Sequence, residues 1–171
     1  VMSYSAHVIF WFEMPMYMKA RAMLYGAGYI ILPYPYIWHQ TNAKIAPSYR
    51  AALIGTSGNR KFEAFWNQTR YAAPTPASKQ HPHQQSEPML KRLLSMFVSE
   101  HTIMLDPACG SGAALCAAEA LGAGSVLGLD INQTYCEIAN KRVQQAKNLR
   151  KLSKLVIPKN APQAKVTTHV D

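Results

Sequence analysis

The feature that most constrains this chain is a glycine-rich loop between a short apolar strand and an alanine-rich helix. Ile103 to Asp106 is the expected strand, and Gly112 to Leu121 is the expected helix. Between them the sequence reads Asp106-Pro107-Ala108-Cys109-Gly110-Ser111-Gly112. Glycines let the backbone turn sharply and approach a ligand, and the free amides at a helix start offer hydrogen-bond donors. The sequence therefore predicts a loop that binds a small molecule.

A second carboxylate follows at the end of the next expected strand, Ser125 to Asp130. Asp130 lies 18 residues after Gly112, close to the offset at which an acid in a Rossmann-type fold accepts hydrogen bonds from ribose hydroxyls. A helix is expected from Gln133 to Leu149, so the order is strand, helix, strand, helix, which predicts an α/β fold with a parallel sheet. The alternative is a generic turn with an acid placed by chance, and the joint spacing argues against it.

The first residue of the loop discriminates between classes of ligand. A pyrophosphate-binding loop has the pattern G-x-G-x-x-G and carries no carboxylate at its first position. Asp106 opens this loop, and its negative charge would repel a phosphate but attract an ammonium or a sulfonium group. The expected cofactor is therefore S-adenosylmethionine and not a dinucleotide.

These residues resemble the cofactor motifs of the N4-cytosine and N6-adenine DNA methyltransferases, D-P-x-x-G-S-G and an acid after the next strand. Upstream, His83-Gln84-Gln85-Ser86-Glu87-Pro88 is similar to the H-x-x-Q-K-P segment that closes over the methionine end of the cofactor in that family. Glu87 stands where lysine is usual, and Ser86 where glutamine is common. The resemblance implies a set of cofactor-binding residues: His83, Asp106, Pro107, Ala108, Cys109, Gly110, Ser111, Gly112, Asp130, Ile131 and Asn132.

The N-terminal third resembles the same family more loosely, so that the resemblance covers residues 5–145. The similar segments are Ala6 to Phe12, Pro35 to His39 and Ala52 to Gly55. The family's catalytic motif is Asp, Asn or Ser followed by Pro-Pro and an aromatic residue, and Leu32-Pro33-Tyr34-Pro35 does not match it. In members with the catalytic region first, the motif would precede Ala6, so we expect it before Val1, in a missing N-terminal segment or a partner chain. The implied fold is a Rossmann-like S-adenosylmethionine-dependent methyltransferase, permuted in motif order and incomplete at its N-terminus.

The resemblance implies a function: a fragment of a DNA methyltransferase, of restriction–modification or phage type, that methylates the exocyclic amine of adenine or cytosine. In the implied mechanism the target base leaves the duplex and the amine attacks the sulfonium methyl group. Alignment of the two reactants supplies much of the rate, so this chain alone is expected to bind the cofactor but methylate poorly. Two alternatives stay open: a methyltransferase acting on RNA or protein, and a non-catalytic or degenerate cofactor- or nucleic-acid-binding module.

Charge also points to a polyanionic partner. Eighteen Lys and Arg against nine Asp and Glu give a net charge of +9, which suits DNA, with an anionic membrane surface as the alternative. Candidate DNA contacts are Trp38, His39, Arg60 and Lys61, although a tryptophan beside a strand is more often core. The basic tail, residues 151–171, is expected to be disordered and could grip phosphates.

The remaining expectations concern compartment and domain limits. Cys109, Cys116 and Cys136 lack metal-ligand spacing, which indicates reduced thiols, a cytoplasmic location and no metal site. No apolar run reaches the roughly 20 residues that cross a membrane.

Residues 1–150 are expected to form one methyltransferase domain, with a target-facing region at 1–71, a linker and cofactor lid at 72–88 and a cofactor-binding unit at 89–150. Further expected elements are a strand from Ala6 to Phe12, a helix from Met14 to Tyr25, an edge or bulged strand from Gly28 to Trp38, its partner from Ser48 to Thr56, and a helix from Pro88 to Ser99.

Overall fold

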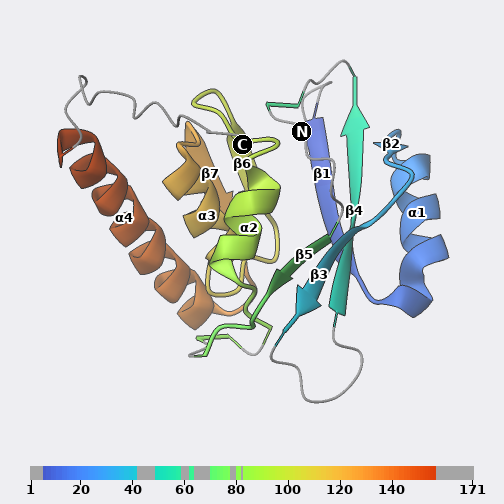
Figure 1. The fold of residues 1–171 in the computed structure, drawn as a ribbon, viewed down its shortest axis with the longest axis horizontal. Helices are drawn as coiled ribbons and strands as arrows, with labels where there is room; N and C mark the ends of the chain where they lie inside the picture. The colour runs from blue at the N-terminus through green and yellow to red at the C-terminus, as the bar shows by residue number, and fades with distance from the viewer. Residues whose placement is uncertain are drawn as a thin grey trace, which may run out of the picture.

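The chain folds into an N-terminal mixed sheet and a C-terminal unit of two parallel strands and three helices (Figure 1). The structure is a computed structural model that describes residues 6–41, 49–58, 62–63, 70–77, 80–81 and 83–156. Its elements in chain order are β1 (Ala6–Phe12), the 3-10 helix η1 (Met14–Met16), α1 (Tyr17–Gly26), β2 (Ile30–Ile31), β3 (Tyr36–Gln40), β4 (Tyr49–Ser57), β5 (Arg70–Ala73), α2 (Glu87–Leu94), β6 (Ile103–Asp106), α3 (Ala113–Leu121), β7 (Ser125–Gly128) and α4 (Gln133–Val156).

The N-terminal sheet is organised around β4. Its strand order is β1-β4-β3-β5, and the short β2 also pairs with β4. Strands β1, β2 and β3 are antiparallel to β4, whereas β3 and β5 are parallel. The strand predicted from Ala6 to Phe12 is confirmed with those bounds. The pairing predicted between Ser48 to Thr56 and the segment that contains β3 is also confirmed, and the structure shows that it is antiparallel.

For the segment from Gly28 to Trp38, predicted to be an edge or bulged strand, the edge alternative is wrong. An interrupted strand agrees with the structure, because β2 and β3 both pair with β4 and are separated by residues 32–35. Pro33 and Pro35 fall between two strands, β2 and β3, and do not interrupt either hydrogen-bonded ladder. Strand β3 lies inside the sheet, between β4 and β5. Proline cannot occupy a strand position whose N–H must donate to a neighbouring strand. Because both prolines precede β3, this strand can pair on both sides.

The segment predicted as a linker, residues 72–88, contains regular structure at both ends. Its first residues complete β5, and its last two begin α2. The indole N–H of Trp38 donates a hydrogen bond of 2.9 Å to the Ala73 carbonyl, which attaches the end of β5 to the core. The predicted limits of the linker, residues 72 and 88, therefore each fall inside a regular element.

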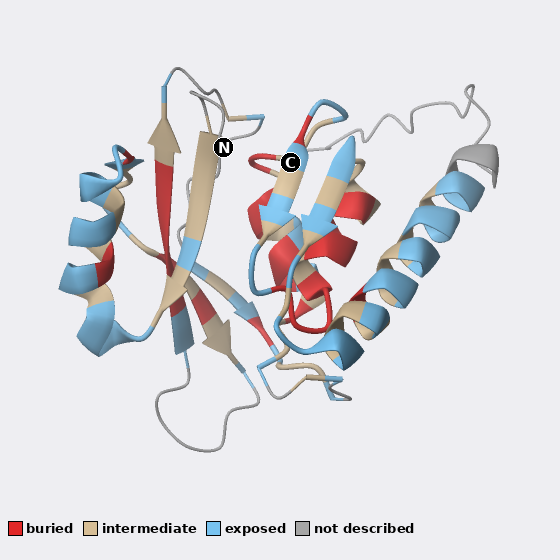
Figure 2. Ribbon diagram, turned by 180° about the vertical axis from the view of Figure 1, so that it is seen from behind, coloured by how far each residue is buried: buried red, intermediate tan, exposed pale blue. Residues whose placement is uncertain are grey.

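The C-terminal unit is the predicted strand–helix–strand–helix arrangement. Strands β6 and β7 pair in parallel, with Asp106 opposite Gly128 at their carboxyl ends. Helix α3 packs against both α2 and α4 and is mostly buried, whereas the outer residues of the strands, Ile103, Leu105 and Leu127, are exposed (Figure 2). Helix α2 ends at Leu94, before the predicted Ser99, and α4 continues past the predicted Leu149 into the segment assigned to the tail.

The extension of α4 follows from its composition. Residues 150–156 consist of Arg, Lys, Leu, Ser and Val, and the first helix-breaking residue is Pro158. The helix therefore continues for seven residues beyond Leu149, to Val156. Residues 157–171, most of the predicted disordered tail, lie outside the described residues.

Helix α2 joins the two parts into one core. Its residues Met89, Leu90 and Leu93 are at most 2% exposed. They belong to one apolar cluster with Trp38 of the N-terminal sheet and Ala117 of α3. The N-terminal sheet and the C-terminal unit therefore hold each other in place through this helix.

Candidate functional site

The glycine-rich loop lies across the carboxyl ends of β6 and β7. The Leu129 amide donates to the Asp106 carbonyl and the Cys109 amide donates to the Leu129 carbonyl, each at 2.9 Å. Inside the loop, the Gly112 amide donates to the Cys109 carbonyl at 2.8 Å, which closes a turn before α3 begins. The loop is thus fastened to the segment after β7, at the position where ligands bind in open parallel sheets.

Gly112 sits at a position that a side chain would fill. It caps the start of α3 with a φ of +76°, a left-handed conformation that favours glycine. A Cβ added there would lie 2.8 Å from the Cβ of Ala139 in α4. The backbone of the loop and helix α4 therefore approach each other as closely as they do because residue 112 is glycine.

Asp106 is a partly buried carboxylate at the start of the loop. Its Oδ1 accepts a hydrogen bond of 3.1 Å from the Ala108 amide. Burial raises the pKa of Asp106 above its ordinary value, and the nearby charge of Asp130 adds to this rise, while the bond from Ala108 opposes it. A carboxylate in this position gains from a cation placed beside it, because the cation would offset its lost hydration.

Asp130 ties the loop to the start of α4. Its Oδ2 accepts from the Gly110 amide and its Oδ1 accepts from the Asn132 amide, both at 2.9 Å. The bond from Asn132 is the main cause of a lowered pKa for Asp130, and the bond from Gly110 and the nearby His81 act in the same direction. Each carboxylate oxygen keeps a second lone pair for a ligand hydroxyl.

The other predicted cofactor residues lie around this carboxylate. Asn132 accepts a bond of 2.9 Å from the Thr134 amide and so caps α4, and Ile131 is fully exposed. Ser111 is 2% exposed and Cys109 is 8% exposed. The structure therefore brings residues 106–112 and 130–132 together at one end of the parallel strands.

Cys109 is a packing residue of the loop. Burial raises the pKa of its thiol, and the neighbouring Asp106 adds to this rise. The thiol is therefore held in its neutral form, which favours the role of a small loop filler over that of a reactive thiolate. Its Sγ would lie 2.8 Å from a Cβ placed on Gly128 of β7.

The segment before α2 reaches the loop through residues that sequence reasoning did not select. The Ser111 hydroxyl donates to Gln84 Oε1 at 3.1 Å. His81 lies edge-on against Tyr135 with ring centroids 4.5 Å apart, and its ring would be 3.3 Å from a Cβ on Gly110. The predicted His83 is exposed, and its Nδ1 lies 3.5 Å from Arg50 Nη2. The signal for Gln84 and His81 was their place beside His83 in the same segment.

The position expected for the catalytic motif, before Val1, lies outside the described residues, which begin at Ala6. The location of that motif therefore stays a prediction. Residues 106–112 and 130–132 are predicted to bind the cofactor, and none of them is predicted to be catalytic.

Of the four candidate DNA contacts, the structure describes Trp38 and His39. Trp38 is 1% exposed and its indole N–H is bound to a backbone carbonyl, so the prediction that it stacks on a base is wrong and its role is core packing. His39, the next residue along β3, is partly exposed and its Nδ1 lies 3.2 Å from Arg70 Nη2. Arg60 and Lys61 lie outside the described residues.

An apolar groove of about 370 Å³ lies between β1 and β6 and leads to Asp106 and Pro107. His7, Ile9 and Trp11 of β1 line one side of the groove, residues of β6 line the other, and apolar residues of α2 line it as well. Among the described strands, β1 pairs only with β4 and β6 pairs only with β7. The groove therefore brings solvent-accessible apolar surface up to the first residue of the loop.

Two further structural findings concern metals and membranes. Across the part of the chain that the structure describes, no group of three or more His, Cys, Asp or Glu side chains is arranged to hold a metal ion. Among the same residues, no helix has both the length and the hydrophobicity to cross a membrane.

Comparison with known proteins shows two kinds of similarity. The model of a family described as DNA methylase, N6_N4_Mtase, matches residues 3–141, whereas no curated protein matches the chain. The complex of M1.HpyAVI with SAM superposes with a TM-score of 0.70 at 18% identity, covering 81% of this chain and 74% of that chain.

Two other solved structures give similar values. For TTHA0409 of Thermus thermophilus, complexed with S-adenosyl-L-methionine, the TM-score is 0.62 at 18% identity, covering 83% of this chain and 70% of that chain. For the PvuII DNA methyltransferase (cytosine-N4-specific), it is 0.64 at 12% identity, covering 86% and 68%. At these identities the likeness establishes a shared fold.

Proposed function

The chain belongs to the N6/N4 DNA methylase family, and on this premise we propose that it binds S-adenosylmethionine over the loop between β6 and α3. It serves as the donor half of a methyltransferase that acts on the exocyclic amine of adenine or cytosine in DNA. The observation that carries the proposal is the loop of residues 106–112, held by Asp130 across the carboxyl ends of two parallel strands. M1.HpyAVI and TTHA0409, which share the fold, were both solved with this cofactor.

The residues of the site fit the chemical groups of the cofactor. We propose that Asp130 accepts hydrogen bonds from the ribose hydroxyls through its remaining lone pairs. Asp106, whose burial leaves its charge in need of a counterion, faces the cationic methionine part. The glycines at 110 and 112 let His81 and Ala139 pack closely against the loop, which fixes the shape of the loop on which the cofactor lies. We propose that the segment that contains His83 covers the cofactor from the side of α2.

When bound, S-adenosylmethionine supplies an electrophilic methyl group on a sulfonium centre. The contribution of this chain is to hold that group in one orientation and to keep it ready for the incoming amine. The groove between β1 and β6 ends at Asp106 and Pro107, and we propose that the acceptor approaches the loop from this side.

DNA is the proposed acceptor because of the family and because the chain carries a net charge of +9. Arg50 and Arg70 of the described sheet are both exposed cations that can reach phosphate groups. His39, which lies beside Arg70, stays a further candidate contact. A restriction–modification or phage setting and a cytoplasmic location are part of the same proposal.

The cofactor assignment can be tested by thermal unfolding with different ligands. At about 100 times its dissociation constant, a ligand adds about 2.7 kcal/mol to the free energy of unfolding, which raises the melting temperature by roughly 5 to 10 °C for a chain of this size. We expect this shift with S-adenosylmethionine and with S-adenosylhomocysteine, and none with NAD. An equal shift with NAD, or no shift with either adenosyl ligand, would contradict the proposal.

A further inference from the structure

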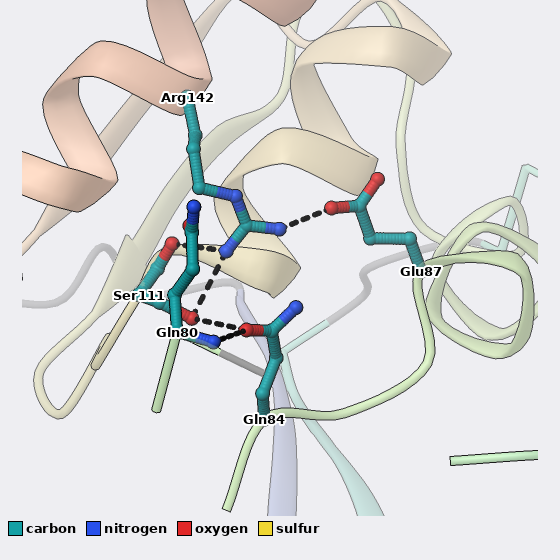
Figure 3. A network of polar contacts seen from close by, with 5 residues as sticks. All are labelled: Gln80, Gln84, Glu87, Ser111 and Arg142. Carbon is teal, nitrogen blue, oxygen red and sulfur yellow. Dashed lines mark hydrogen bonds and ion pairs between the residues drawn. The ribbon is translucent and has the colours of Figure 1, made fainter. Parts of the chain in front are cut away.

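We propose that Arg142 of α4 is a positioning residue that clamps the segment before α2 onto the cofactor loop. This segment is defined as residues 83–87 and ends on the first residue of α2, Glu87, which is the ionic partner of Arg142. The proposal rests on the proposed function, because it concerns how the same loop is held ready for S-adenosylmethionine. Figure 3 shows the guanidinium between the loop on one side and Glu87 on the other. Arg142 does not belong to the residues that the sequence motifs select.

The contacts of Arg142 divide between two segments that are far apart in the sequence. Its Nη1 donates to the Ser111 carbonyl oxygen and, at 2.9 Å, to the Ser111 hydroxyl. Its Nη2 donates to Glu87 Oε1, which makes an ion pair. A guanidinium presents donors in a rigid fork, so one side chain can hold both partners at once, which a lysine cannot do.

The Ser111 hydroxyl connects Arg142 with the segment before α2 through hydrogen bonds. It accepts from Arg142 and donates to Gln84 Oε1 at 3.1 Å. The same Gln84 oxygen accepts a hydrogen bond of 2.9 Å from the backbone N–H of Gln80. Two routes therefore connect α4 with the segment that resembles the cofactor lid: one runs directly to Glu87, and the other runs through the loop to Gln84.

The burial of this network makes each contact matter. Ser111 is 2% exposed, and the Arg142 side chain is 14% exposed against 36% for Glu87. A partly buried ion pair that loses one partner leaves the other charge uncompensated. A lysine at position 87, as in the segment that this one resembles, would place two cations together, whereas the acid present here matches Arg142.

Helix α4 is suited to act as the common support. It begins just after Asp130, whose carboxylate holds the Gly110 amide. Ala139, three residues before Arg142, contacts the position where Gly112 has no side chain. The loop is therefore attached to α4 at Gly112 and Ser111, and at Gly110 to Asp130 just before the helix. Arg142 is the attachment that also includes the segment before α2.

The chain contains a matched control for this test. Arg150 lies on the same helix, eight residues after Arg142, and forms an ion pair of 3.0 Å with Glu119 of α3. The Glu119 side chain is 6% exposed. This pair braces α4 against α3 and contacts neither the loop nor the segment before α2, so its loss reports the effect of a structural ion pair alone.

The experiment compares Arg142→Ala with Arg150→Ala in the full chain, by calorimetric titration with S-adenosylmethionine and by amide hydrogen exchange without ligand. Both variants are expected to melt at a lower temperature than the wild type. Only Arg142→Ala is expected to raise the dissociation constant, by roughly tenfold, an effect of the size seen for residues that act through a packed network. Only this variant should exchange faster at residues 83–86 and 110–111.

A second pair of variants separates positioning from folding. Glu87→Gln keeps an oxygen for the guanidinium and should bind within about threefold of the wild type, whereas Glu87→Lys should bind roughly tenfold more weakly. Equal dissociation constants and equal loop exchange for Arg142→Ala and Arg150→Ala would overturn the clamp. If the folded wild type does not bind S-adenosylmethionine, the proposed function fails, and unchanged exchange in Arg142→Ala would then refute the clamp separately.

Discussion

Replacing Gly112 with alanine is expected to abolish measurable binding of S-adenosylmethionine and to lower the free energy of unfolding by about 2 to 5 kcal/mol. The left-handed φ of +76° accounts for part of this loss, because a residue with a Cβ is strained there. The rest comes from overpacking, since the new Cβ would lie 2.8 Å from the Ala139 Cβ and 3.0 Å from its Cα. Urea unfolding and titration with the cofactor measure the two effects.

Gly26→Ala is the matched control for this substitution. Gly26 is the last residue of α1, and a Cβ added there meets nothing within 4 Å. Alanine in a helix is expected to leave stability unchanged or to raise it by up to about 1 kcal/mol, with unchanged cofactor binding. The account of the loop would be contradicted if Gly112→Ala unfolded and bound the cofactor as Gly26→Ala does.

Asp106→Asn is expected to weaken binding of S-adenosylmethionine by roughly 10- to 100-fold, the effect of losing one charge-assisted contact. Asparagine keeps the size of the side chain and an oxygen for the Ala108 amide, so the loop should keep its shape. The neutral ligand 5′-methylthioadenosine lacks the ammonium and sulfonium charges and should bind both proteins alike. An equal loss of affinity for the two ligands would show that Asp106 supports the loop and does not interact with the positive charge of the cofactor.

The same substitution predicts a pH dependence. Burial raises the pKa of Asp106, so its carboxyl becomes protonated at a higher pH than an ordinary aspartate. As the pH is lowered, the affinity of the wild type for S-adenosylmethionine should therefore begin to fall at a higher pH than the ordinary pKa of an aspartate would give. In Asp106→Asn this contribution is absent, and a titration series at several pH values should show a flatter curve.

The C-terminal unit was the part of the fold most accessible from the sequence. The order of β6, the loop, α3, β7 and α4 follows from short-range patterns: a short apolar run, glycines and an alanine-rich helix. The family inferred from the D-P-x-x-G-S-G motif is confirmed by the family match over residues 3–141. The Rossmann-like methyltransferase fold is confirmed by the structural similarity to M1.HpyAVI and the PvuII enzyme.

The N-terminal sheet was harder to predict because its pairing is long-range. Strand β5 has only four residues, and it exists because β3 offers an edge more than 30 residues earlier in the chain. Pro33 and Pro35 predicted an edge or bulged strand, and they fall between β2 and β3, outside both ladders. Trp38 illustrates the same limit, since a sequence does not show that an indole will find the Ala73 carbonyl and the core.

The support of the site was also hidden from the sequence. Arg142 and Glu87 are 55 positions apart, and Arg142 lies on a helix whose exposed face is rich in cations. Glu87 was visible only as a departure from a motif. Its partner became evident once α4 was placed beside the loop, because the pairing depends on the packing of Ala139 against Gly112.

Above all, we propose that the loop of residues 106–112 and Asp130 form a binding site for S-adenosylmethionine. Calorimetric titration of the folded chain, with Asp130→Ala as the comparison, tests it most directly. We expect the wild type to bind one cofactor per chain in a saturable manner. Asp130→Ala should bind at least roughly tenfold more weakly, because it loses the ribose contacts and the hydrogen bond from the Gly110 amide. Equal binding by the two proteins, or no binding by the folded wild type, would contradict it.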